Sequence, residues 1–130
     1  GKCFAIWGLA FKPETDDVRD APALVIIDEL RNRGATIQAY DPEAIETARQ
    51  ALGENNIDYV SDPYAAVDNA DALIVVTEWR EFKQPDFRRL SKTLKSKLIF
   101  DGRNIYNPER VADYGLHYEG IGRSSKLFQE

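Results

Sequence analysis

The sequence predicts an α/β domain with a Rossmann-like, doubly wound, mainly parallel sheet of five to six strands flanked by helices. Short apolar segments of strand length alternate with segments whose apolar residues recur at helical spacing. The segment 72–76 is apolar without alternation, which is typical of a parallel strand covered on both faces. Alternating strands and helices favour a parallel sheet with right-handed crossovers, and we expect the strand order 3-2-1-4-5-6.

The elements of the first half follow from this alternation. We expect strands over 2–8, 35–42 and 57–60, and helices over 21–34 and 43–53. The first helix is predicted because apolar residues recur at helical spacing from Ala23 to Leu30, and Gly34 suits its C-terminal end. Asp41 and Pro42 close the second strand.

The second half continues the pattern with strands over 72–76 (within the segment 71–79), 97–103 and 116–122, the last one weak, and helices over 62–70, 86–94 and 107–115. Asp62 and Asn107 each precede a proline and are predicted N-caps, and Gly115 suits a helix end. We expect one domain over 1–123 and a frayed tail over 124–130.

The composition and net charge limit the kinds of partner that the protein is expected to bind. The chain has 130 residues, 43% of them hydrophobic and 30% charged, as in ordinary globular proteins. The net charge of −5 argues against nucleic acid or an anionic membrane as the main partner. A single cysteine cannot form an internal disulfide, which fits a reducing compartment. The absence of methionine and the strand-like first residues indicate a domain of a longer protein.

Two cations follow strand ends of the predicted sheet. Ligands of such sheets bind beyond the carboxyl ends of the strands, and Lys12 and Arg103 follow the first and fifth strands. The compact charge of a lysine and the planar guanidinium group of an arginine together suit a phosphate or pyrophosphate. Gly102 would either let the backbone approach closely or adopt positive φ before Arg103. Each cation also has a plainer interpretation: Lys12 as a solvated lysine, and Arg103 as a partner of Asp101 or a helix cap.

The first loop does not carry a dinucleotide fingerprint, because "GLAFK" replaces G-x-G-x-x-G after the first strand. Asp41 ends the second strand, where such a fingerprint places an acid on a ribose hydroxyl. Without the glycine loop, we interpret Asp41 as the turn and cap residue before the helix over 43–53.

Four acidic residues precede the first helix, namely Glu14, Asp16, Asp17 and Asp20. No metal site is predicted from them, since a calcium loop needs a glycine that this stretch lacks. We interpret them as favoured by the helix dipole, with one of them orienting Arg19.

The remaining candidates do not form a catalytic set. Cys3 is interpreted as a packing residue, and the single histidine, His117, has no evident partners for nucleophilic catalysis. Trp79 and Phe82 are expected to pack a loop over the sheet, with contact to a ligand or partner chain as the alternative. No catalytic residue is therefore predicted within this chain.

Four segments in order, "GLAFKPETDDVRDAPAL", "YDP", "VVTEWREF" and "IFDGRNIY", carry a resemblance that extends from residue 1 to about residue 123. The chain resembles the C-terminal UDP-binding domain of the UDP-glucose/GDP-mannose dehydrogenase family, which includes the UDP-glucose 6-dehydrogenases. The resemblance implies an NAD-dependent, two-step oxidation of UDP-glucose to UDP-glucuronate, with GDP-mannose or UDP-N-acetylmannosamine as alternative substrates. It also implies a cytoplasmic, homodimeric parent enzyme.

The resemblance also assigns roles to residues. Phe11 and Lys12 match the family's F-K turn and Arg103 matches its D-G-R segment, which implies contact with the UDP-sugar. Arg19 matches the arginine of T-D-D-x-R, which implies contact with NAD. In the family, NAD is held mainly by an N-terminal domain, and the nucleophilic cysteine lies in an upstream G-x-C segment that Cys3 does not match. This chain is thus expected to be inactive alone. The contrasting hypothesis is a non-catalytic, Rossmann-like module for nucleotide binding or assembly.

Overall fold

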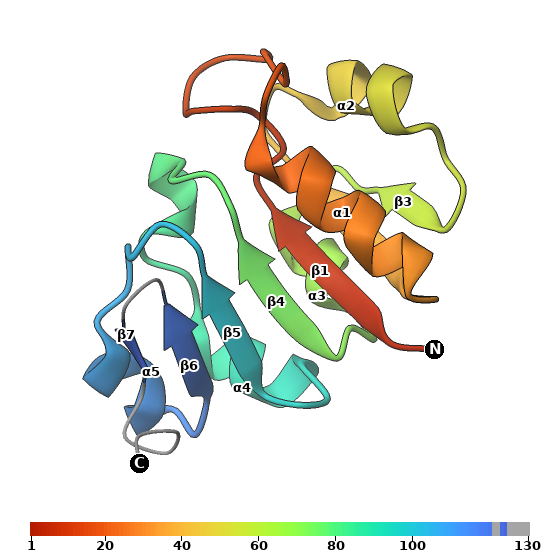
Figure 1. Cartoon of the computed structure of the whole chain (residues 1–130). Helices are drawn as coiled ribbons and strands as arrows, with labels where there is room; N and C mark the ends of the chain where they lie inside the picture. The colour runs from red at the N-terminus through yellow and green to blue at the C-terminus, as the bar shows by residue number, and fades with distance from the viewer. Residues whose placement is uncertain (121–122, 125–130) are drawn as a thin grey trace.

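A seven-stranded sheet with the order β3-β2-β1-β4-β5-β6-β7 lies at the centre of the computed structural model, which describes residues 1–120 and 123–124 (Figure 1). Strands β1 to β6 are all parallel, and the short β7 pairs antiparallel with β6. The predicted strand order is confirmed. The strands are β1 (Cys3–Trp7), β2 (Thr36–Tyr40), β3 (Ile57–Tyr59), β4 (Ala72–Val75), β5 (Leu98–Asp101), β6 (His117–Gly120) and β7 (Arg123–Ser124).

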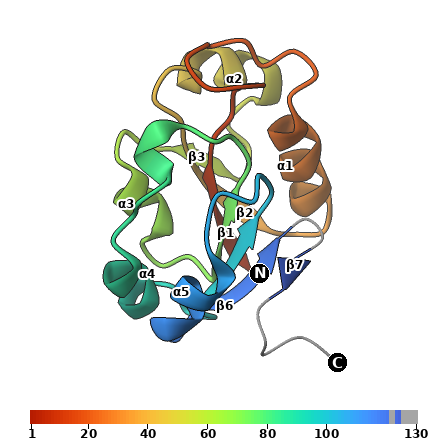
Figure 2. The ribbon, with the colours of Figure 1, turned by 90° about the vertical axis from the view of Figure 1, so that its left-hand side faces the viewer.

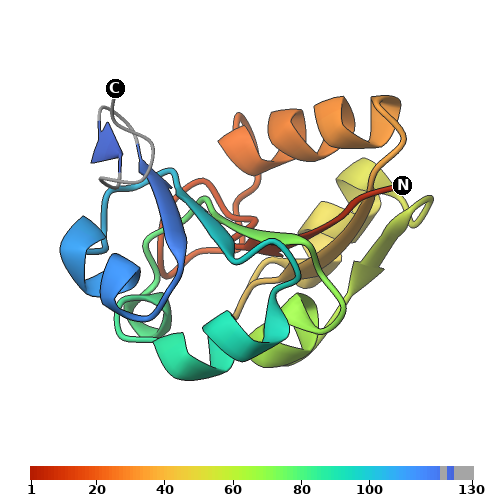
Figure 3. The same ribbon diagram turned by 90° about the horizontal axis from the view of Figure 1, so that it is seen from below.

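Helices cover both faces of the sheet, as Figures 2 and 3 show. One face carries α1 (Pro22–Asn32) and α2 (Ile45–Leu52). The other carries α3 (Pro63–Val67), α4 (Phe87–Thr93), α5 (Pro108–Asp113) and the short 3₁₀ helix η1 (Arg80–Phe82). This three-layer arrangement is the predicted doubly wound α/β fold. No helix in the part of the chain that the structure describes is both long and apolar enough to cross a membrane.

Strand β1 divides the core between the two faces. Because side chains alternate along a strand, Ala5 and Trp7 pack with α3, α4 and α5, while Ile6 packs with α1 and α2. The Trp7 ring stacks on Phe82 of η1 with 5.1 Å between ring centroids. Trp79 and Phe82 are both buried, which confirms that they pack the loop after β4 over the sheet.

The predicted helix ends are largely confirmed. Asp62 and Asn107 accept backbone N–H bonds at the first turns of α3 and α5. Gly34, Gly53 and Gly115 all adopt positive φ after helices. The last predicted strand, 116–122, is observed as β6, and residues 121–122 lie outside the described residues. Residue 124 of the expected tail belongs to β7, and residues 125–130 lie outside the described residues as well.

All six parallel strands end at the same edge, which is the upper edge in Figure 1. The loops over 8–20, 41–44, 76–79 and 102–106 gather there. Every cation that the sequence singled out lies in one of these loops, so this carboxyl edge is the candidate site.

Candidate functional site

The loop after β1 is in direct contact with the loop after β4. Gly8 has φ 103°, and a Cβ on it would lie 2.6 Å from the backbone nitrogen of Thr77. Thr77 is buried, and its hydroxyl donates a 2.7 Å hydrogen bond to the carbonyl of Ala10. Glycine is therefore required at position 8 by both the backbone conformation and the close approach of β4's loop.

Asp41 closes the turn after β2. Its Oδ1 accepts hydrogen bonds from the backbone N–H groups of Glu43 and Ala44, each at 2.8 Å. The interpretation of Asp41 as a turn residue is confirmed. The N-cap of α2 itself is Ala44, so the helix begins later than predicted.

The second oxygen of Asp41 binds two other loops. Asp41 is 1% exposed, and its Oδ2 accepts from Leu9 N at 2.7 Å, Ala10 N at 3.1 Å and Trp79 Nε1 at 3.1 Å. The carboxylate thus joins the loops after β1, β2 and β4. A carboxylate has about four lone-pair sites, and five donors already surround this one, so no acceptor remains for a ribose hydroxyl.

Phe11 and Lys12 directly follow Leu9 and Ala10, whose backbone N–H groups Asp41 binds, and both face solvent. The Phe11 side chain is 51% exposed although it is large and apolar. Its backbone N–H donates to the carbonyl of Asp17 at 2.8 Å, which closes the loop between them. Lys12 is exposed and makes no hydrogen bond or ion pair with another described residue. Both side chains are thus available at the carboxyl edge.

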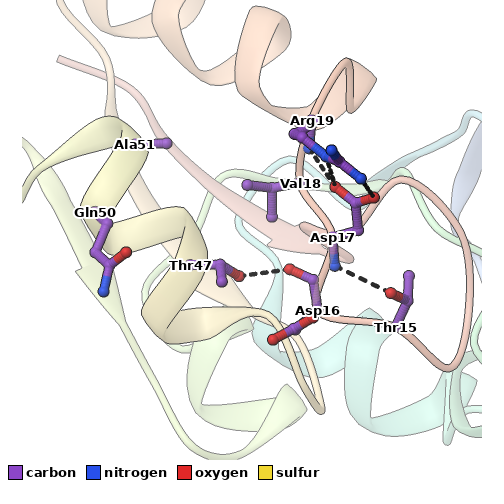
Figure 4. A pocket seen from close by; sticks show the side chains of 8 residues that line it. All are labelled: Thr15, Asp16, Asp17, Val18, Arg19, Thr47, Gln50 and Ala51. Carbon is purple, nitrogen blue, oxygen red and sulfur yellow. Dashed lines mark hydrogen bonds and ion pairs between the residues drawn. The ribbon is translucent and has the colours of Figure 1, made fainter.

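Arg19 is held by Asp17 in the same loop (Figure 4). Its Nε donates to Asp17 Oδ1 at 3.0 Å and its Nη2 to Oδ2 at 2.8 Å. The Arg19 hydrogen bond lowers the pKa of Asp17 to about 2, and the charge of Lys12 contributes to the same direction. The prediction that one of the acids orients Arg19 is confirmed.

A hollow of about 680 Å³ adjoins Arg19. It lies between the loop after β1 and α2, and the Thr47 hydroxyl of α2 donates to the Asp16 carbonyl at 2.7 Å (Figure 4). Its lining residues are Thr15, Asp16, Asp17, Val18, Arg19, Thr47, Gln50 and Ala51. The Arg19 side chain is 87% exposed at the rim of this hollow.

The acidic residues before α1 do not cap the helix. Ala21 is the N-cap with no side-chain hydrogen bond, and no acidic residue lies in the first turn. The interpretation that the helix dipole favours these acids stays a prediction. Glu14 and Asp20 instead adopt positive φ in the loop. Among the described residues, no three histidine, cysteine, aspartate or glutamate side chains are grouped to hold a metal ion.

The loop after β5 is anchored by a second buried aspartate. Asp101 Oδ1 accepts from Arg103 N at 3.1 Å, while Oδ2 accepts from Tyr106 N at 2.9 Å and Tyr118 Oη at 2.8 Å. Gly102 donates its N–H to the Val75 carbonyl at 2.8 Å. A Cβ on Gly102 would lie 2.9 Å from that oxygen, so the backbone does approach closely here, to β4, whereas the alternative of a positive φ at Gly102 is not observed.

The Arg103 side chain pairs with Glu78 from the loop after β4. Both Nε and Nη2 donate to Glu78 Oε2, at 3.1 Å and 2.9 Å. Burial acts to raise the pKa of Glu78, but the hydrogen bond from Arg103 helps to outweigh it and the pKa is lowered. The alternative in which Arg103 pairs with Asp101 holds only for its backbone N–H. Sequence reasoning did not identify Glu78 as a partner, because no local spacing links the two loops.

The structure brings Lys12 and Arg103 to the same edge on loops of nearby strands. Only β4 separates β1 from β5, so the two strands lie about 10 Å apart at the usual strand spacing. The loop of β4 touches both neighbours, through Thr77 on one side and Glu78 on the other. A basic rim over the carboxyl ends of β1, β4 and β5 is chemically suited to a phosphorylated ligand.

Comparisons with known proteins point to one family. A sequence model of the UDP-glucose/GDP-mannose dehydrogenase family, UDP binding domain, matches residues 5–108. The UDP-glucose 6-dehydrogenase of Pseudomonas aeruginosa is 45% identical over 134 residues, covering 95% of this chain and 28% of the relative. The enzyme of Rhizobium meliloti is 46% identical over 123 residues, with the same two coverages.

Solved structures show the same fold. A UDP-glucose dehydrogenase from Pyrobaculum islandicum superposes with a TM-score of 0.75 at 35% identity, over 92% of this chain and 25% of that one. A UDP-D-ManNAc dehydrogenase from Pyrococcus horikoshii superposes with a TM-score of 0.73 at 31% identity, over 94% of this chain and 26% of that one. The chain thus spans about a quarter of the length of its relatives. It belongs to the UDP-glucose/GDP-mannose dehydrogenase family, as its UDP binding domain.

Proposed function

We propose that this chain is the UDP-sugar-binding domain of an NAD-dependent UDP-glucose 6-dehydrogenase, which oxidises UDP-glucose to UDP-glucuronate in two steps. The observation that carries the proposal is the placement of Lys12 and Arg103 at one sheet edge, on loops tied together through the loop after β4. This placement occurs in a chain that is 45% identical to a UDP-glucose 6-dehydrogenase. We propose that residues 1–123 form the domain.

The diphosphate is the part of the ligand that these cations would recognise. Lys12 supplies a compact charge and Arg103 a planar set of donors, which together offset the charge of a diphosphate. Phe11 adds an exposed apolar ring next to Lys12. Such a ring is well suited to pack on the uridine or on the hexose, and this contact gives a reason for its exposure.

NAD is proposed to be held mainly by an N-terminal domain of the same polypeptide. The residues of this chain do not fit the usual dinucleotide site, because the glycine loop is replaced and Asp41 is saturated by five donors. When bound, NAD accepts a hydride in each oxidation. The contribution of this chain is limited to Arg19, which we propose contacts the cofactor from the rim of the hollow beside α2.

The proposal extends to the whole enzyme, which we expect to be a cytoplasmic homodimer. This chain supplies substrate contacts but no nucleophile, since Cys3 lies at the start of β1, where it is partly buried. The side chains that perform the chemistry are thus assigned to the remainder of the parent protein. Incubation of the isolated chain with NAD and UDP-glucose is accordingly expected to produce no NADH.

The test is made in the full-length dehydrogenase that contains this domain. Lys12→Ala and Arg103→Ala are each expected to raise KM for UDP-glucose by at least about tenfold, the order for losing one charged contact. Lys92→Ala is the matched control, because Lys92 is an exposed lysine in α4 and its loss should leave KM unchanged. Unchanged KM in both test variants would contradict the proposal.

A second substrate class is favoured by one comparison, the UDP-D-ManNAc dehydrogenase structure that superposes at 31% identity. The same cations would bind any nucleoside diphosphate sugar, since they recognise the phosphates. Turnover assays with UDP-glucose, UDP-N-acetylmannosamine and GDP-mannose distinguish these substrates. The highest kcat/KM is expected for UDP-glucose. A preference for another sugar would change the proposed substrate, but Lys12 and Arg103 would remain the proposed diphosphate-binding residues.

A further inference from the structure

Glu78 contacts Arg103 along one edge of the guanidinium group. Its Oε2 accepts from Nε at 3.1 Å and from Nη2 at 2.9 Å, and these two donors lie on the same side of the planar group. The interaction therefore fixes the plane of the guanidinium as well as its position. A solvated pair with a single contact would fix neither.

The opposite edge of the guanidinium remains available. Arg103 has five N–H donors, and Glu78 uses one on Nε and one on Nη2. Nη1 makes no hydrogen bond with any described residue, and the Arg103 side chain is 40% exposed. The two terminal nitrogens thus present a pair of parallel N–H donors, which is the geometry that binds two oxygens of a phosphate.

The position of Glu78 is itself fixed by the residues on either side. Thr77 is buried and donates its hydroxyl to the carbonyl of Ala10, and Trp79 is nearly buried and donates Nε1 to Asp41. The Thr77 bond ends on the segment immediately before Lys12, and Asp41, which accepts the Trp79 bond, also accepts the backbone N–H groups of Leu9 and Ala10 in that segment. Glu78 therefore sits on a backbone segment that is held in register with the loop that carries the other cation.

Arg103 is also held at its backbone, through the Arg103 N–H bond to Asp101 and the Gly102 N–H bond to the Val75 carbonyl. With both the backbone and the guanidinium held, little freedom remains to be lost when a ligand arrives. Ordering a long side chain at the moment of binding reduces affinity. An arginine that is ordered beforehand avoids this loss.

We propose that Glu78 is a positioning residue that orients the guanidinium of Arg103 so that its terminal nitrogens face the diphosphate of the nucleotide sugar. The inference rests on the proposed function and names a residue that acts through Arg103. Two other roles are possible for a carboxylate beside a binding arginine: it can compete with the ligand for the arginine, or it can merely stabilise the loop. The geometry favours positioning, because the ligand-binding edge is left open.

The test measures steady-state kinetics of the full-length dehydrogenase with UDP-glucose. Glu78→Gln preserves the shape of the side chain and removes the charge that makes its hydrogen bonds strong. We expect KM to rise about three- to tenfold with kcat unchanged, since the contact is made equally in the ground and transition states. In the Arg103→Ala background, Glu78→Gln should have no further effect, because the two residues act as one unit.

Glu29→Gln is the matched control, since Glu29 forms an exposed ion pair with Arg33 on α1. Its KM should remain that of the parent enzyme. A Glu78→Gln variant with unchanged KM would overturn the inference, and a lowered KM would replace positioning by competition. Equal effects of Glu78→Gln with and without Arg103 would reduce Glu78 to a stabilising residue.

Different kinetic results would contradict the proposed substrate site and the proposed positioning role of Glu78. If Arg103→Ala raises KM and Glu78→Gln does not, the positioning role is lost while the proposed substrate site remains. If Arg103→Ala leaves KM unchanged, the assignment of Arg103 to the substrate site is lost, and the role of Glu78 is lost with it.

Discussion

The two cation-bearing loops of the carboxyl edge are anchored to different extents. The loop after β5 places Arg103 two residues beyond the strand, after the buried Asp101 and directly after Gly102, which touches β4. The loop after β1 is anchored at Leu9 and Ala10, but its Lys12 has no partner among the described residues. One cation is thus ordered before ligand arrives, and the other is not.

The difference shows how this domain anchors the loops at its carboxyl edge without a glycine-rich loop. A buried aspartate at the end of a strand accepts backbone N–H groups, and it does so twice, at Asp41 and at Asp101. Asp101 acts mainly on its own loop. Asp41 acts on two other loops as well as its own, so it controls the position of the β1 loop from a neighbouring strand.

The largest expected loss of stability comes from replacing these two aspartates, and it should be larger at Asp41 than at Asp101. In Asp41→Asn, the amide NH₂ replaces one of the two carboxylate oxygens, and each of these oxygens accepts at least two N–H groups, so at least two N–H donors lose their acceptor. In Asp101→Asn, the same change leaves at least one backbone N–H group without an acceptor. At about 1–3 kcal/mol for each unpaired buried donor, we expect losses in unfolding free energy of about 4 and about 2 kcal/mol. Equilibrium urea unfolding measures both.

Asp58→Asn is the control for this comparison, because Asp58 is exposed on the edge strand β3. It should change the unfolding free energy by less than about 0.5 kcal/mol. Equal losses for Asp41→Asn and Asp101→Asn would show that the contacts between loops add nothing, and the comparison would no longer hold.

The next largest expected loss of stability comes from replacing Gly8 at the start of the loop after β1. Gly8→Ala forces a residue with a Cβ into φ 103° and brings that Cβ to 2.6 Å from Thr77. We expect a loss of about 3 kcal/mol, from the backbone strain and the overpacking together. Gly34→Ala has a similar φ of 90° but no atom within 4 Å, so it isolates the backbone contribution at about 1 kcal/mol.

Urea unfolding of both glycine variants provides the measurement. If Gly8→Ala and Gly34→Ala lose the same free energy, the contact with Thr77 does not constrain the loop. The anchoring of the β1 loop would then rest on Asp41 alone.

The fold was predictable because it depends on local patterns. Three kinds of signal depend only on residues that are close in sequence: the apolar run at 72–76, the caps at Asp62 and Asn107, and the glycines after the helices. Together with the handedness of crossovers, they were sufficient for the strand order. The boundary of α2 was missed because the turn made by Asp41 continues to Ala44.

The site was predictable only in part. Lys12 and Arg103 could be placed on one edge, because the carboxyl ends of parallel strands share an edge. Their partners could not be predicted, since Glu78 and Arg103 come from different loops and meet only after folding. The contacts of the second Asp41 oxygen were likewise beyond prediction. The position suggested a turn, which accounts for Oδ1, but nothing in the sequence indicated that Oδ2 would bind Leu9, Ala10 and Trp79.

The smallest expected effect lies in the second half of the β1 loop, where Asp17 holds Arg19. The Arg19 hydrogen bond lowers the pKa of Asp17 to about 2 from its ordinary value of 3.8. Because the folded-state pKa is depressed, the stabilisation is present above the unfolded pKa and is lost as the pH falls from about 4 through about 2. The pair is exposed, so the change in stability should be slight, and the titration itself is the sensitive measurement.

Arg19→Gln should return the pKa of Asp17 towards 3.8 in an NMR titration of the carboxyl carbon. Lys12→Ala should raise it less, since Lys12 acts through charge alone while Arg19 donates two hydrogen bonds. This order of effects would show that the loop after β1 fixes Arg19 and leaves Lys12 unpaired. A larger shift with Lys12→Ala would mean that Lys12 pairs with Asp17 in solution, and both loops would then hold their cations before ligand binds.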